Sequence, residues 1–208
     1  MRDRLVLVLL LLSSLLATAQ LSSQVPTVQK PLPKWDIYLG YGLTRVGSSN
    51  LTPAFNSNGG VVQLQWHFGS RLSGVAEFNG STKSNINHQK IDQALYSFMG
   101  GPRYAFPVRA GKQIIFAEGL FGYSRSQSDI SVPGTIPITQ VANNQYDFSM
   151  FIGGGTELRV SPKIWFRPAE VGYYMTTFPA IVVPGLGVWN ASGRQNDLRY
   201  SVGLRFAF

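Results

Sequence analysis

The sequence has no cysteine and few charged residues. The absence of cysteine from all 208 residues excludes disulfide cross-links, thiol nucleophiles and cysteine-ligated zinc. Asp, Glu, Lys and Arg make up 13% of the chain, about half their usual share. There are only two histidines, and no set of residues has metal-ligand spacing. We therefore expect neither a metal site nor another cofactor.

Long apolar runs are absent beyond the N-terminus. Residues 5–16 are apolar except for Ser13 and Ser14, and this run is about half of the ~20 residues that a membrane-spanning helix needs. A short basic segment precedes it, and Ala17–Thr18–Ala19 follows with the small residues of a cleavage site. This order predicts a cleaved secretory signal peptide over residues 1–19, with a retained membrane anchor as the alternative. Residues 20–33 are rich in Ser, Gln and Pro without periodicity, which predicts a linker.

Aromatic residues, at 12% of the chain, follow a period of two. The pattern is clearest at the end of the chain, where apolar residues at even positions from Leu198 to Phe208 alternate with small or charged ones. Seven earlier segments between Trp35 and Thr176 alternate in the same way. Because successive side chains of a strand point to opposite faces, the sequence predicts eight β-strands.

The two faces of these strands differ in chemistry. In seven of the eight strands one face carries no charge and is rich in Trp, Tyr, Phe and Leu, whereas the other mixes Gly, Ser and Gln with a few charges of both signs. A soluble sandwich would instead crowd Lys and Glu on its outer face. Strands of about ten residues also suit a tilted membrane crossing. We therefore predict an all-β fold: a closed, antiparallel, up-and-down transmembrane β-barrel of eight strands over residues 34–208. A soluble exported barrel that binds a small apolar ligand is the less favoured alternative.

Long and short connections alternate along the chain. The long ones are expected at residues 45–60, 81–91, 125–146 and 177–194, and the short ones at 69–71, 106–112 and 160–163. Outer-membrane barrels have long external loops and short periplasmic turns. This alternation places the linker at 20–33 and the C-terminus in the periplasm.

Two segments resemble a known family. The C-terminal segment 198–208 ends in Phe after alternating aromatic and apolar residues with an upstream Gly, and Phe98–Met–Gly–Gly–Pro–Arg–Tyr104 is similar to a strand of the OmpA-like outer-membrane β-barrels. The resemblance implies export to the cell outer membrane and contact with outer-membrane lipid and lipopolysaccharide. It also implies that the barrel-assembly machinery recognises the terminal strand through Tyr200, Gly203, Leu204, Phe206 and Phe208. The peptidoglycan-binding domain of the OmpA family has no counterpart here, so a cell-wall tether is not carried over.

The charged face of the strands supplies the candidate site. We expect an ion-pair network inside the barrel formed by Asp36, Glu77, Arg103, Glu118, Glu157, Arg159, Arg167, Glu170, Arg199 and Arg205. Strands one and eight must be neighbours in a closed barrel, so Asp36 and Arg205 are expected to pair. The interior of an eight-stranded barrel is just wide enough for side chains to fill it. We therefore favour a plugged lumen over a narrow channel for small solutes.

The seventh strand contains a conflict of faces. Arg167 and Glu170 have opposite parity, so a regular strand would point one of them at lipid. A lipid-facing charge near mid-height costs a few kcal/mol. Because Pro168 cannot donate to the ladder, we predict a bulge near Pro168–Ala169 that turns both charges inward and leaves Val171 and Tyr173 facing lipid.

The function expected from this fold is a structural or surface-interaction role of the external loops, not catalysis. The basic residues are dispersed and match no nucleic-acid-binding motif, so we expect no nucleic-acid partner. Lys83, Lys90, Arg125 and Arg194 suit either attraction to lipopolysaccharide or simple solvation. Ser84, His88 and Asp92 leave a lipid-modifying enzyme as a weak alternative. Apolar loop segments at 130–138 and 178–189 suit either strand extensions or a contact surface for a partner that the sequence does not identify.

Overall fold

The computed structural model describes residues 34–47, 54–84, 91–130, 145–178, 181–183, 187–190 and 193–208. The expected signal peptide at 1–19 and linker at 20–33 lie outside these residues, as do His88, Lys90 and most of the apolar loop segment at 130–138. None of the helical segments within the described ranges has the length and apolar character needed to cross a membrane.

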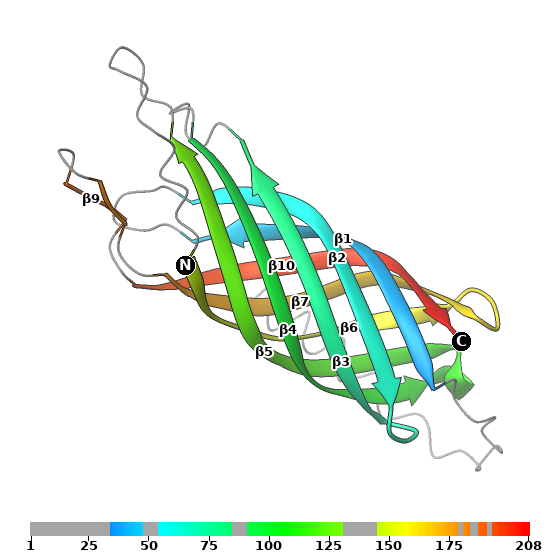
Figure 1. Ribbon diagram of the computed structural model, residues 1–208. Coiled ribbons are helices and arrows are strands. Elements are labelled where there is room, and N and C mark those ends of the chain that lie inside the picture. Colours follow the sequence, from blue (N-terminus) through cyan, green and yellow to red (C-terminus); the bar gives the residue numbers. More distant parts are fainter. Residues whose placement is uncertain are drawn as a thin grey trace, which may run out of the picture.

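Eight strands close into one antiparallel barrel, which confirms the predicted fold class (Figure 1). Around the barrel their order is β1, β10, β7, β6, β5, β4, β3, β2, so sequence neighbours pair throughout and the last barrel strand closes on the first. The barrel strands are β1 (Trp35–Val46), β2 (Phe55–His67), β3 (Leu72–Lys83), β4 (Ile91–Val108), β5 (Gln113–Ile130), β6 (Gln145–Arg159), β7 (Ile164–Phe178) and β10 (Gly193–Ala207). A separate two-stranded sheet, β8 (Ile181–Val183) with β9 (Gly187–Asn190), was not predicted.

The connections alternate in length, as predicted. Residues 68–71, 109–112 and 160–163 form short links at one end of the barrel, which we call the turn end. The C-terminus lies at the turn end (Figure 1). The longer links lie at the opposite end, which we call the loop end.

The strands are longer than the sequence pattern indicated. The expected loop at 45–60 is wrong in extent, because β2 begins at Phe55 and its ladder with β1 runs from Trp35–Trp66 to Val46–Phe55. β4 and β5 have 18 residues each and project past their neighbours at the loop end (Figure 1). Backbone hydrogen bonds do not need apolar side chains, so the ladders continue beyond the apolar part of the strands.

The outer face of the barrel is apolar and aromatic. Large outward residues such as Leu39, Tyr41, Trp66 and Phe121 are 49%, 51%, 48% and 49% exposed. Most inward residues are buried, and many of these are polar or charged. This distribution is the inverse of a soluble protein, and it is the distribution that a membrane barrel requires.

The predicted bulge in β7 is confirmed. Ser201 pairs with Glu170 and Gly203 pairs with Arg167, so three residue steps in β7 oppose two in β10. The ladder with β6 shifts at the same place. Arg167 and Glu170 are 0% and 1% exposed, whereas Val171 and Tyr173 are exposed on the outer face. The extra residue thus lets two charges of opposite parity share the lumen.

The bulge makes β7 unequally sensitive to deletions. Deleting Pro168 removes the extra residue, and a regular strand then still points Arg167 and Glu170 inward. Deleting Tyr173 instead lets the strand stay regular only if Glu170 faces lipid. We expect the first deletion to change the unfolding free energy in vesicles by less than about 1 kcal/mol and the second to lower it by roughly 2 kcal/mol or more. Urea titration followed by tryptophan fluorescence checks this, and equal damage from both deletions would contradict it.

Candidate site: an ion-pair network in the barrel lumen

The barrel lumen holds charged side chains contributed by most of its strands. Nine of the ten residues expected there are buried, at most 4% exposed. They come from β1, β3, β4, β5, β6, β7 and β10. The alternation of each strand explains their placement, because a strand that presents apolar residues outward must turn the intervening charges inward.

Arg167 lies at the centre of this network. Its guanidinium donates to Glu157 Oε1 from Nε (3.1 Å) and Nη2 (2.7 Å), and it pairs with Glu170 through Nη1. Nη1 also donates to Gln63 Oε1 at 2.8 Å. The same cation lies over the Tyr38 ring, 3.7 Å from the ring centroid. Every side of the guanidinium is therefore contacted by an acceptor or an aromatic face.

A second arginine extends the network across the lumen. Arg199 pairs with both oxygens of Glu77, donates from Nη2 to Glu170 Oε1 at 3.1 Å, and lies 3.7 Å from the Phe151 ring centroid. Glu170 thus bridges Arg167 and Arg199, both of which are 1% exposed or less. Two buried cations that share one carboxylate fix the spacing between β7 and β10.

A third arginine, Arg103, links β4 to β5 and to β2. Arg103 pairs with Glu118, with Nε 2.7 Å from Oε2, and donates to the amide oxygens of Gln65 (2.9 Å) and Gln63 (2.6 Å). Gln63 Nε2 donates to Glu77 Oε2 at 2.8 Å. Gln63 therefore connects the Arg103–Glu118 pair to Glu77 and to Arg167, whereas Gln65 connects Arg103 to Ser73.

Asp36 and Arg205 close the network at the turn end. They form the expected ion pair between the first and last barrel strands, and Arg205 Nε also lies 2.8 Å from Glu157 Oε2. Asp36 Oδ2 lies 2.6 Å from His67 Nε2, and the Ser73 hydroxyl lies 3.0 Å from His67 Nδ1. Four guanidinium groups and five carboxylates are thus joined into one network that spans the lumen.

Ser73, His67 and Asp36 form a serine–histidine–carboxylate row that the sequence did not indicate. The row lacks the access that a nucleophile needs, because Ser73 is 1% exposed and its oxygen also accepts from Gln65 Nε2 at 2.9 Å. Asp36 is shared with Arg205. These contacts tie β1, β2 and β3 together at the turn end, and they engage the hydroxyl with both Gln65 and His67.

Arg159 is the one expected lumen residue that the structure places elsewhere, and this expectation is corrected. Its side chain is exposed at the turn end, where Nε donates to the carbonyl of Ser161 at 3.4 Å and the guanidinium lies 5.8 Å from the Trp165 ring centroid. It is the last residue of β6, so the chain already turns away from the lumen there. Alternation still holds at this position, but the barrel wall that would cover the side chain has ended.

Apolar side chains fill the lumen on the loop side of the network. Met99, Leu120, Phe151 and Tyr174 are 0% exposed and belong to one buried cluster. Tyr174 hydroxyl lies 2.9 Å from Ser124 Oγ, which satisfies its polar atom. The sequence pattern marked Met99, Leu120 and Phe151 only as residues opposite the lipid face. Their packing into one cluster depends on strands that are distant in the sequence.

Glu77, Glu118 and Glu170 each place a carboxylate oxygen within 4.8 Å of the others. Such a triad offers ligands of the type that divalent cations prefer. Arg103, Arg167 and Arg199 already pair with these carboxylates. The arginines therefore neutralise the triad, which fits an ion-pair plug better than a metal site.

Comparison with known proteins places the chain in context. Residues 7–206 match the model of the outer membrane protein beta-barrel domain family. None of the curated proteins compared with the chain matches it.

Two solved structures are similar in fold. Neisserial surface protein A is 14% identical with a TM-score of 0.59, and the match covers 86% of this chain and all of that one. Ail, the attachment invasion locus protein of Yersinia pestis, is 16% identical with a TM-score of 0.55, over 85% of this chain and all of Ail. Ail has also been solved in complex with the heparin analogue sucrose octasulfate, a match with 16% identity, a TM-score of 0.50 and the same coverage.

The central position of Arg167 makes it the most sensitive residue of the lumen. Replacing Arg167 with Met leaves Glu157 and Glu170 with one buried cation fewer, and we expect a loss of about 3–5 kcal/mol in unfolding free energy. The matched variant Arg159→Met, at the exposed turn end, should change it by less than about 0.5 kcal/mol. Adding Glu157→Gln and Glu170→Gln to Arg167→Met should recover part of the loss. Urea titrations in vesicles measure the unfolding free energy of the two single variants and of the triple variant. Equal losses in Arg167→Met and Arg159→Met would refute the stabilising role of the network.

Proposed function

Because the chain belongs to the outer membrane protein beta-barrel domain family, we propose that it is a sealed outer-membrane barrel whose role lies at its external loop end. The observation that carries the proposal is the lumen, where the ion-pair network joins the walls and the cluster around Phe151 packs above it. A lumen blocked by paired charges does not offer solutes an aqueous path. Members of this family have short periplasmic turns and longer external loops. We therefore orient the barrel with its turn end in the periplasm and its loop end outside the cell.

The outer surface fits a membrane and not free solution. The exposed aromatic and aliphatic residues of the outer face would need a partner in water, and a bilayer supplies one. This argument disfavours the alternative of a soluble barrel that binds an apolar ligand. Export through a cleaved signal peptide at 1–19 remains part of the proposal on the sequence evidence alone.

The terminal strand suits the proposed role in assembly. Tyr200, Leu204 and Phe208 are exposed on the outer face at 39%, 40% and 66%. A side chain at Gly203 would clash with the backbone of Leu39 and Gly40, so the glycine permits close pairing of β10 with β1. We infer that the barrel-assembly machinery reads the outward aromatic row before β10 closes the barrel.

The loop end carries cationic side chains, some exposed and some half-buried. Arg45 and Arg194 are exposed on the outward face of β1 and β10 near their loop ends, and Lys83 and Arg125 lie at the same end of β3 and β5. Cations at this level suit the phosphate groups of lipopolysaccharide around the barrel. The complex of Ail with a sulfated heparin analogue shows a polyanion bound to a protein of this fold. We propose lipopolysaccharide as the partner of this surface in our protein.

No catalytic role is proposed. The serine of the Ser73–His67–Asp36 row is buried, and His88 of the second candidate set lies outside the described residues. The contacts of the first set support a structural function.

Because the lumen is sealed, we predict that the barrel does not conduct ions. Purified protein inserted in planar bilayers should give no stepwise current above that of the bare membrane. Replacing Arg103 and Glu118 together with Ser removes one complete ion pair without leaving a lone charge, and it should produce a measurable current. A steady, salt-dependent current from the unaltered protein would instead support the narrow channel.

The cation surface predicts selective loss of lipopolysaccharide binding. The double variant Arg45→Gln/Arg194→Gln should bind lipopolysaccharide at least fivefold more weakly in 0.1 M salt, because charge-assisted contacts to phosphate are lost. The matched double variant Lys112→Gln/Lys163→Gln removes two cations from the turn end and should bind as before. Retention on immobilised lipopolysaccharide measures both, and equal losses would mean that net charge, not this surface, decides binding.

A further inference from the structure

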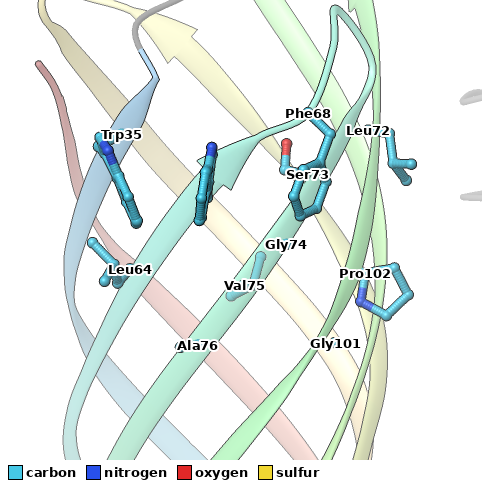
Figure 2. A pocket seen from close by; sticks show the side chains of 11 residues that line it. Trp35, Leu64, Phe68, Leu72, Ser73, Gly74, Val75, Ala76, Gly101 and Pro102 are labelled. Carbon is cyan, nitrogen blue, oxygen red and sulfur yellow. The ribbon is translucent and has the colours of Figure 1, made fainter.

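The outer face of the barrel has an apolar groove at the turn end, away from the loop end (Figure 2). Its volume of about 440 Å³ falls within the range, about 300–1,000 Å³, of small-molecule sites. The groove lies across β1 to β4, and its lining includes Trp35, Trp66, Phe68 and Leu72 as bulky members.

Aromatic rings form the walls of this groove. The rings of Trp35 and Trp66 are 4.6 Å apart between centroids, and Phe68 stacks on Trp66 at 5.9 Å. Phe68 reaches over Gly74, where a Cβ would approach its ring to 3.1 Å. The three rings are 40%, 48% and 66% exposed, so nothing in the described part of the chain covers them.

The floor of the groove is low because small residues stand where the rest of the outer face has bulky ones. Gly74 pairs with Pro102, and Ala76 pairs with Gly100. The next pairs that face outward along this ladder are Leu72–Tyr104 toward the turn end and Phe78–Phe98 toward the loop end. The depression is therefore bounded along the strands as well as across them.

Two exposed cationic residues at the turn end directly precede lining residues of the groove in the chain. Lys34 precedes Trp35, and its carbonyl accepts from the backbone of His67 at 3.1 Å. Arg71 precedes Leu72, and its carbonyl accepts from Ala105 at 2.7 Å. Both side chains are exposed, and neither forms an ion pair within the described ranges. An apolar groove whose lining residues adjoin two exposed cationic residues in the chain matches a molecule that has a hydrocarbon chain and an anionic head.

We propose that this groove binds one acyl chain of an anionic phospholipid from the membrane leaflet at the turn end, with the lipid phosphate held by Lys34 and Arg71. The lipid-facing position of the groove gives hydrocarbon direct access to it, and the ring walls supply contacts that a smooth barrel surface lacks. The site is separate from the lumen and from the loop-end cations. Its occupancy therefore does not depend on whether the loops bind lipopolysaccharide.

The test is native mass spectrometry of the full barrel refolded in detergent with added dioleoyl phosphatidylglycerol. The unaltered protein should retain one lipid per barrel. Ala76→Leu fills the groove with an apolar side chain and should lower that occupancy at least fivefold. Ala117→Leu makes the same change on the exposed outer face of β5, outside the groove, and should leave occupancy unchanged. The shift in gel mobility on boiling in SDS verifies that each variant is folded.

The head group is tested separately. Lys34→Gln/Arg71→Gln should lower retention of phosphatidylglycerol at least threefold while leaving retention of dioleoylglycerol, which has no phosphate, unchanged. Equal lipid retention by the unaltered protein and Ala76→Leu would overturn the proposal. A second result would also overturn it. If the unaltered protein shows the mass of a dimer and no lipid adduct, and if Ala76→Leu abolishes that dimer, the groove holds a second copy of the chain.

Discussion

Four arginine side chains inside a barrel of eight strands impose the constraint on which the rest of the structure depends. A buried guanidinium is tolerated only where carboxylates and hydrogen-bond acceptors surround it. Arg103, Arg167, Arg199 and Arg205 meet this requirement together, because Glu157 is shared among three of them and Glu170 and Gln63 are each shared between two. The network therefore cannot be divided into independent pairs, and it holds the strands that contribute to it at fixed distances.

The backbone accommodates this requirement at two places. In β7 the bulge adds one residue, so that Arg167 and Glu170 face the same side despite their opposite parity. Between β1 and β10, Gly203 allows the strands to approach closely where the barrel closes, and the Asp36–Arg205 pair forms across the same seam. Barrel closure and charge pairing thus support each other, because the seam brings the two ends of the network together.

Because the lumen is filled, the proposed function lies at the outer surfaces. The two ends of the outer face differ: the loop end has outward arginines above the aromatic residues, and the turn end has a ring-walled groove whose lining residues adjoin Lys34 and Arg71 in the chain. Both arrangements combine hydrocarbon contact with positive charge, which is the chemistry of an anionic lipid. The interior in this view supplies rigidity, and the surface supplies recognition.

The sequence by itself determined the number of strands, the closed antiparallel fold, the face on which each strand residue lies and even the bulge in β7, because all of these follow from a period of two and from the cost of a charge in lipid. It did not determine strand ends, since the ladders continue through residues such as 55–60 whose side chains have no apolar pattern. The sequence pattern placed Arg159 in the lumen wrongly, because the alternation of faces does not show where the barrel wall ends. Apart from the Asp36–Arg205 pair, which barrel closure predicted, only the tertiary structure decided which acid meets which base, that Gln63 contacts both Arg103 and Arg167, and that Ser73, His67 and Asp36 share one row. The acid–base contacts that the sequence did not predict join residues up to 122 positions apart, and their distances depend on the tilt and closure of the whole barrel, which no local pattern in the chain encodes.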